Sequence, residues 1–168
     1  MQTPAKPVSP SEIAALEHAF SSDPSSNAWR QLTEAYVSVG RFMEAMVVCK
    51  KGVKARPDDP SARVLLAGVY AAQGKDRKAL EELSEALKGH PDDVPANRMA
   101  GILQLKLGEK EAGEAALRRA AQARPDDAET LEAMRKWGVA PPPPRPPPAT
   151  PPVLERARPA AANAAAAG

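Results

Sequence analysis

The side chains of this sequence that could do chemistry are two histidines, one cysteine and three pairs of adjacent aspartates. Histidine acts as a general acid or base, cysteine as a nucleophile, and both bind zinc, while paired carboxylates bind hard cations. His18 and His90 are far apart in the sequence, and Cys49 is the only cysteine. Two distant histidines and one cysteine do not make a convincing set of zinc ligands. No glycine-rich phosphate loop or nucleophile motif accompanies them. We therefore predict no catalytic residue, no metal and no cofactor.

The aspartate pairs recur with a fixed period, which gives them another explanation. Three prolines spaced 34 residues apart each begin the tripeptide Pro-Asp-Asp: Pro57, Pro91 and Pro125. Three glycines recur at the same interval: Gly40, Gly74 and Gly108. A period of this size is typical of stacked helical repeats. The aspartates are therefore expected to be turn and helix-cap residues, not metal ligands.

This period divides the sequence into three units, at residues 26–59, 60–93 and 94–127, and each unit is expected to hold two helices. The glycine of each unit is predicted to end the first helix in the left-handed conformation. The proline cannot continue the second helix, and the second aspartate is placed to cap the next one. The predicted caps are Ser25, Asp59, Asp93 and Asp127.

A capping helix is predicted at residues 9–24, before the first unit. Ser9 and Glu12 match a capping box, and Pro10 suits the first helical position. Such a helix covers the end of a repeat array with a polar outer side. Residues 1–8 before it are predicted to be disordered.

A second capping helix is predicted at residues 128–138, after the last unit. It is expected to turn three apolar side chains inward: Leu131, Met134 and Trp137. From residue 139 onward the sequence is rich in proline and alanine and cannot form a packed core. Residues 139–168 are therefore predicted to be a disordered, extended arm.

Inside the units, large and small side chains recur at fixed positions. Unit one shows the pattern most fully, with Trp29, Leu32, Tyr36, Ala45 and Pro57. Unit three departs from it at Asn97, Gln104 and Gly113. The pattern resembles the tetratricopeptide repeat over residues 25–127. The departure at Gly113 is expected to cost roughly 1 kcal/mol relative to alanine in a helix interior.

This resemblance implies an all-α fold, in which antiparallel helix pairs stack into a short right-handed superhelix. It also implies a protein–protein interaction scaffold or adaptor, which is not an enzyme. In that family, one side of each first helix lines a concave groove for peptides. The corresponding partner-binding residues here are Gln31, Glu34, Val64, Leu65, Gly68, Arg98, Met99 and Ile102.

The expected groove is polar in unit one and apolar in units two and three, which suits a partner helix or an extended peptide with apolar anchors. The alternative is that residues 128–137 or the arm cover Met99 and Ile102. Family members that hold chaperone carboxylates carry lysine, asparagine and basic residues at defined groove positions. Here only Arg30 is compatible with that role, so the resemblance does not extend to a carboxylate clamp.

The composition of the chain limits the cellular compartment and the kinds of partner that we expect. With 23 basic and 21 acidic residues, the net charge of +2 is too small to predict nucleic-acid binding. A single cysteine excludes an intrachain disulfide and suits a reducing compartment. No segment approaches the roughly 20 apolar residues that span a bilayer, and the first ten residues lack a signal-peptide core. We expect a cytoplasmic protein that binds neither nucleic acid nor membrane.

The arm supports a second functional hypothesis. Arg145, Pro148 and Pro151 match the pattern of peptides that polyproline-reading SH3 domains bind. Such patterns recur by chance in proline-rich stretches, so the favoured interpretation is that the arm is only a spacer. The alternative to a scaffold is an accessory or regulatory module that the arm tethers to an enzyme or larger complex. The composition, rich in Ala, Pro and Arg, suggests a bacterial source. In bacteria, similar small repeat proteins help to assemble pili, secretion systems or motility machines, and only this analogy suggests such a role here.

Overall fold

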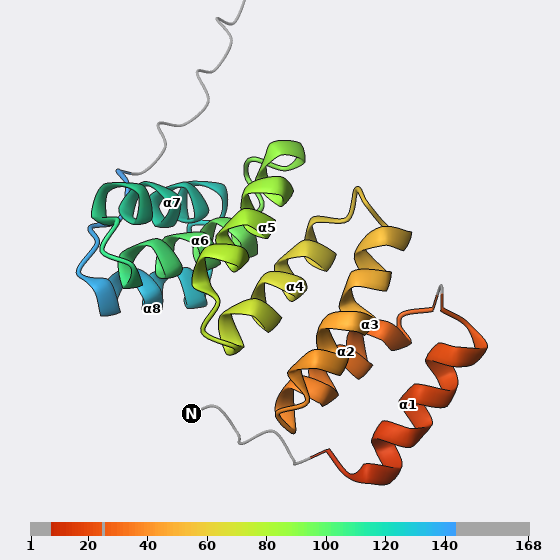
Figure 1. Ribbon diagram of the computed structural model, residues 1–168. Coiled ribbons are helices and arrows are strands. Elements are labelled where there is room, and N and C mark those ends of the chain that lie inside the picture. The colour runs from red at the N-terminus through yellow and green to blue at the C-terminus, as the bar shows by residue number, and fades with distance from the viewer. Residues whose placement is uncertain (1–7, 25, 144–168) are drawn as a thin grey trace, which may run out of the picture.

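The computed structural model describes residues 8–24 and 26–143. Within these ranges the chain forms eight α-helices and no strand, which confirms the all-α fold (Figure 1). The helices are α1 Pro10–Ser22, α2 Ala28–Ser38, α3 Phe42–Ala55, α4 Pro60–Ala72, α5 Asp76–Gly89, α6 Val94–Lys106, α7 Lys110–Ala123 and α8 Ala128–Trp137. Most of the predicted N-terminal segment and of the arm, with its SH3-type motif, lies outside the described residues.

A left-handed glycine makes the turn between the two helices of each pair. The backbone φ is 76° at Gly40, 71° at Gly74 and 83° at Gly108, a region that glycine enters without steric cost. The amide after each glycine donates to the carbonyl five residues earlier, at 2.8 to 2.9 Å. These turns confirm the predicted break inside each unit.

The helix caps follow the sequence signals. The side chains of three aspartates accept hydrogen bonds from backbone amides of the next helix, at 2.9 to 3.0 Å: Asp59, Asp93 and Asp127. The capping box of α1 is present, with Ser9 accepting from the Glu12 amide at 3.2 Å and the Glu12 carboxylate accepting from the Ser9 amide at 2.7 Å. The helix α2 begins after Asn27, which makes no side-chain cap, and the cap predicted at Ser25 lies outside the described residues.

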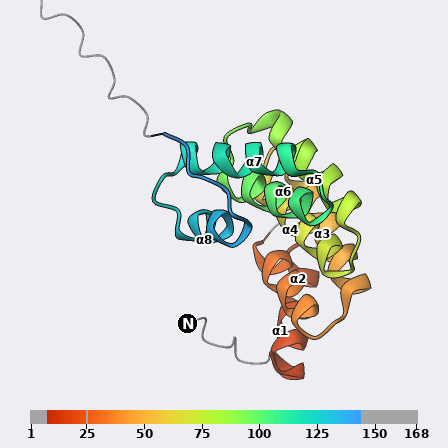
Figure 2. The same ribbon diagram turned by 90° about the vertical axis from the view of Figure 1, so that its left-hand side faces the viewer.

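The helix pairs α2–α3, α4–α5 and α6–α7 stack side by side into a curved array (Figures 1 and 2). At one end α1 packs on α2, and at the other α8 packs on α6 and α7. The helices α2, α4 and α6 lie on the inner side of the curve, and α4 contacts both of the others. Fully buried alanines such as Ala45, Ala62, Ala79 and Ala96 allow this close stacking.

Two glycines bring α6 and α7 into close contact. A β-carbon added to Gly113 would lie 2.8 Å from the carbonyl oxygen of Gly101 and 2.9 Å from the backbone nitrogen of Leu105. These are backbone atoms, which cannot turn aside as a flexible side chain would. The glycine that was expected only to weaken α7 therefore permits its packing against α6.

The terminal helix α8 packs in a different register from the predicted one. Met134 is buried as predicted, but Leu131 and Trp137 each keep 37% of their surface exposed. The Asp127 cap accepts hydrogen bonds from both the amide and the hydroxyl of Thr130, which holds Thr130 inward and fully buried. Leu131 then points about 100° away around the helix. The prediction that Leu131 and Trp137 face the core is therefore wrong.

Candidate functional site

The eight predicted partner-binding residues lie on α2, α4 and α6, the three helices on the inner side of the array. Gln31 and Glu34 lie on α2 and are exposed. The other six lie on α4 and α6 and are half-buried: Val64, Leu65, Gly68, Arg98, Met99 and Ile102. The inner side thus changes from polar to largely apolar between α2 and α6.

Half-buried apolar side chains meet where α4 and α6 are neighbours. The Met99 Cε atom lies 3.9 Å from the position that a β-carbon on Gly68 would take. Val64, Leu65 and Met99, here called the inner apolar strip, pack at the edge of the main core and keep part of their surface exposed. Ile102 instead packs against a second cluster formed with α7 and α8. The suggested covering by the C-terminal helix thus applies to Ile102, while Met99 stays beside α4.

The polar end of the inner side forms a groove against α1, which we call the α1–α2 groove. Its volume is about 600 Å³. It is lined by Val8, Glu12, Ala15, Leu16, Gln31, Glu34, Ala35 and Ser38. The sequence reasoning had found Gln31 and Glu34 but missed the α1 side chains, because that helix was treated only as an end cap. Ile13, Leu16 and Phe20 recur along α1 at helical spacing, and this apolar stripe was the signal that could have found that wall of the groove.

A polar cluster around Tyr36 fixes α1 on α2. The Tyr36 hydroxyl donates to Glu17 Oε1 at 2.6 Å, and the Arg41 guanidinium lies 4.4 Å from the ring centroid and 3.6 Å from Glu17. Burial and the hydrogen bond to Glu17 raise the pKa of Tyr36 to about 12. The hydroxyl therefore stays protonated even in alkaline solution that ionises a free tyrosine, and it remains a donor that holds α1 as the wall of the groove.

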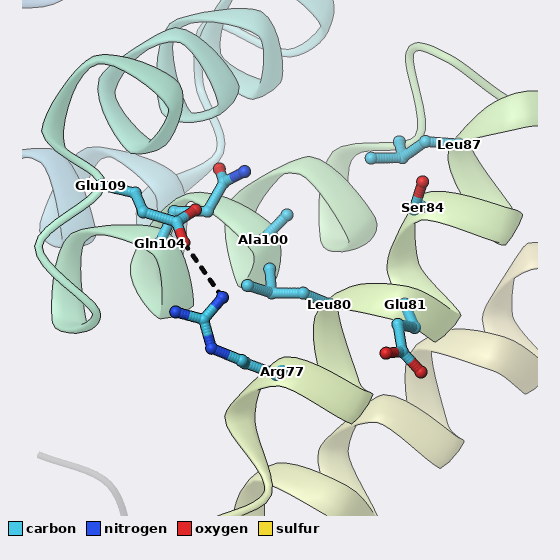
Figure 3. Close-up of a pocket in the computed structure, with 8 residues that line it drawn as sticks. All are labelled: Arg77, Leu80, Glu81, Ser84, Leu87, Ala100, Gln104 and Glu109. Carbon is cyan, nitrogen blue, oxygen red and sulfur yellow. Dashed lines mark ion pairs between the residues drawn. The ribbon is translucent and has the colours of Figure 1, made fainter.

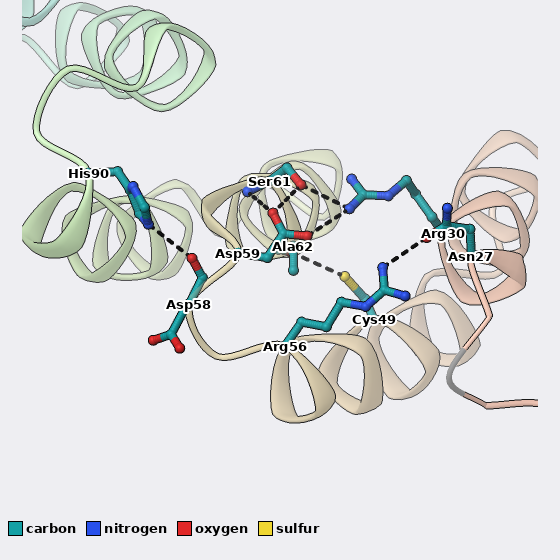
Figure 4. A network of polar contacts seen from close by, with 9 residues as sticks. All are labelled: Asn27, Arg30, Cys49, Arg56, Asp58, Asp59, Ser61, Ala62 and His90. Atoms are coloured by element: carbon teal, nitrogen blue, oxygen red, sulfur yellow. Dashed lines mark hydrogen bonds and ion pairs between the residues drawn. The ribbon is translucent and has the colours of Figure 1, made fainter.

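Two arginines on the inner helices bind the aspartates that cap the helices after their own pairs, and they are not free for a ligand. Arg98 donates to Asp127 at 2.6 Å and pairs with Glu129, and its side chain is only 18% exposed. Arg30 makes the equivalent bond to Asp59 at 3.2 Å (Figure 4). Each arginine precedes its aspartate by 29 residues, a spacing that the sequence displayed and that the sequence reasoning missed.

The residues that suggested chemistry lie apart from one another. His18 is exposed on α1, and His90 is exposed after α5, with its Nε2 atom 2.9 Å from the carbonyl oxygen of Asp58 (Figure 4). Across residues 8–24 and 26–143, no three side chains among His, Cys, Asp and Glu gather as metal ligands would. None of the described helices combines the length and apolar character needed to cross a membrane.

Cys49 is a core residue, so we predict that its thiol is unreactive in the native chain. It is fully buried, its sulfur lies 3.8 Å from the Ala62 carbonyl oxygen, and burial raises its pKa to about 12. The thiolate is the reactive form, so an aromatic disulfide reagent should leave the native chain unmodified at about pH 8. The same reagent should label the chain fully in guanidinium chloride. Rapid labelling without denaturant would contradict the burial of this thiol.

Comparison with known protein families agrees with the repeat pattern of the sequence and with the stacked helix pairs of the structure. Two family models of the tetratricopeptide repeat match residues 36–96 and 69–128, which together span more than half of the chain. No curated protein matches the sequence.

Solved structures share the fold at low sequence identity. The chain is similar to TTC0263, a thermophilic TPR protein in Thermus thermophilus, with a TM-score of 0.66, 21% identity and coverage of 76% of this chain and 70% of that one. The first TPR domain of human RPAP3 gives a TM-score of 0.61 and 21% identity over 66% of this chain and 87% of that one. The first TPR of Spaghetti (RPAP3), solved bound to an HSP90 peptide, gives a TM-score of 0.58 and 19% identity. This match covers 79% of this chain and 94% of that one.

Proposed function

Because the chain belongs to the tetratricopeptide repeat family, we propose that it is a non-catalytic scaffold that binds a segment of a partner protein on the inner side of its stack. The observation that carries this proposal is the inner apolar strip, which leaves apolar surface of Val64, Leu65 and Met99 exposed on two neighbouring helices. The fold does not require apolar residues there, since unit one carries the polar Gln31 where unit two carries Leu65.

The chemistry of this surface defines the partner. An amphipathic helix or an extended peptide with apolar anchors would cover the inner apolar strip. Beyond the strip, the α1–α2 groove offers the apolar side chains of Ala15 and Leu16 beside the carboxylate of Glu34, which favours a basic side chain in the partner. We extend the proposal to a cytoplasmic factor that helps to assemble a bacterial machine.

A crosslinking experiment tests the scaffold proposal. The photoreactive residue benzoylphenylalanine is placed at Ser38, which is exposed in the α1–α2 groove, or at Gln122, which is exposed on α7. After irradiation of the native cells, Ser38 should give a discrete crosslinked partner, and Gln122 should not. Leu65→Gln, which introduces the residue that unit one carries, should lower the yield about tenfold, as loss of one apolar anchor does.

Two controls make this experiment decisive. Leu65→Gln must keep its urea unfolding midpoint, and Ile102 is left unchanged because it packs against α7 and α8. The HSP90 peptide of the RPAP3 complex should not compete for the crosslink, because Arg30 is already paired with Asp59. Equal crosslinking from Ser38 and Gln122, or full yield from the folded variant, would disprove the proposal.

A further inference from the structure

A pocket between α5 and α6 lies apart from the inner apolar strip. Its volume is about 460 Å³, within the range of small-ligand sites. It is lined by Arg77, Leu80, Glu81, Ser84, Leu87, Ala100, Gln104 and Glu109 (Figure 3). Leu80, Leu87 and Ala100 form the apolar part, and an ion pair of 3.6 Å between Arg77 and Glu109 lies at the rim. We call it the α5–α6 pocket.

The repeat itself explains why the pocket exists. At the preceding junction, between α3 and α4, the positions equivalent to Ala100 and Gln104 carry the larger Leu66 and Tyr70, which are both buried. The apolar residues on the other wall remain of similar size, because Leu80 and Leu87 stand where the α3 wall carries Met46 and Val53. Two smaller side chains on α6 therefore leave the space that a leucine and a tyrosine fill one unit earlier.

The tyrosines of the first two units show what this position accommodates. Each reaches back to the preceding helix: Tyr36 donates its hydroxyl to Glu17 of α1, and the ring of Tyr70 lies 5.9 Å from the Lys50 Nζ atom of α3. Gln104 takes the same place in unit three and lines the pocket together with side chains of α5. Its Oε1 atom is buried and accepts no hydrogen bond within the described residues. A buried acceptor of this kind favours a ligand that brings a donor.

We propose that the α5–α6 pocket is a second binding site, which takes a tyrosine side chain from a partner protein. The ring occupies the apolar space beside Leu80, Leu87 and Ala100, in the manner of the tyrosines of units one and two. The phenolic hydroxyl donates to Gln104 Oε1, an amphipathic arrangement that suits tyrosine better than phenylalanine or leucine. This site does not depend on the proposed inner binding surface, since it uses none of the inner apolar strip.

Nuclear magnetic resonance titration of the full chain tests this site with N-acetyl-tyrosinamide as the probe. The amide signals of residues 77–87 and 100–109 should shift, while those of α1 and α2 stay in place. The phenylalanine analogue lacks the hydroxyl and should bind about fivefold more weakly, the effect of one hydrogen bond. The leucine analogue should produce no localised shifts.

Two variants that fill the pocket from within give the control. Gln104→Tyr and Ala100→Leu install the residues of unit two, and either folded variant should lose the localised shifts. The proposal is overturned if the wild-type chain gives no amide shifts in the α5–α6 region, or if the tyrosine, phenylalanine and leucine compounds give the same shifts. It is also overturned if a folded filling variant shows the shifts of the wild type. The wild-type comparison of the analogues decides the question even if neither variant folds.

Discussion

Replacing Gly113 by alanine is expected to destabilise the chain by about 2 kcal/mol, the usual cost of forcing a methyl group into a packed contact. Helix propensity alone predicts the opposite sign, a gain of roughly 1 kcal/mol. The packing effect dominates, because the added β-carbon would meet backbone atoms of Gly101 and Leu105 at 2.8 and 2.9 Å, so α6 and α7 must separate. Urea denaturation followed by circular dichroism measures the change.

Gly89→Ala is the matched control for this prediction. Gly89 is the last residue of α5, and a β-carbon there would meet no atom within 4 Å. Its replacement should leave the free energy of unfolding unchanged or raise it by less than about 1 kcal/mol. If Gly113→Ala proved as stable as the wild type, the close contact between α6 and α7 would be refuted.

Trp29→Ala should cause the larger loss of stability, about 3 to 5 kcal/mol, as truncation of a buried aromatic residue does. Trp29 is 1% exposed and belongs to the main core cluster. Its indole lies directly on Gly52 of α3, a residue with no side chain that could fill the space that the indole would leave. We expect the first helix pair to lose its packing before the rest of the stack.

The second tryptophan provides the comparison for this measurement. Trp137 ends α8 with 37% of its surface exposed, and Trp137→Ala should cost less than about 1 kcal/mol, in line with surface substitutions. Urea midpoints of the two variants, measured at one protein concentration, should therefore differ clearly. Similar losses from the two substitutions would contradict the burial pattern that separates these residues.

Features governed by local chemistry could be predicted from the sequence. The left-handed turn at Gly40 and its repeats, the capping box at Ser9 and the cap at Asp59 each depend on a few adjacent residues. Periodicity then placed the same features in all three units. The eight helices followed from this combination, and so did the helices that carry the candidate partner-binding residues.

Features that depend on contacts between helices were harder to predict. The helical pattern of α8 suited an inward Leu131 as well as an inward Thr130, and the hydroxyl bond of Thr130 to Asp127 favours the second arrangement. Propensity described Gly113 as a weakness, because the approach of Gly101 from another helix is absent from a local pattern. The α5–α6 pocket likewise depends on which helix Gln104 faces.

The capping aspartates have a consequence for how such a chain changes length during evolution. Asp59 and Asp93 each end a Pro-Asp-Asp tripeptide, and each caps the helix that follows it. Deletion of residues 60–93 would join Asp59 directly to Val94, in the place that Asp93 now occupies. Duplication of the same segment would likewise give every helix pair a capping aspartate and its glycine turn. Recombination between copies can therefore shorten or extend the protein in steps of one unit, without inventing a new loop.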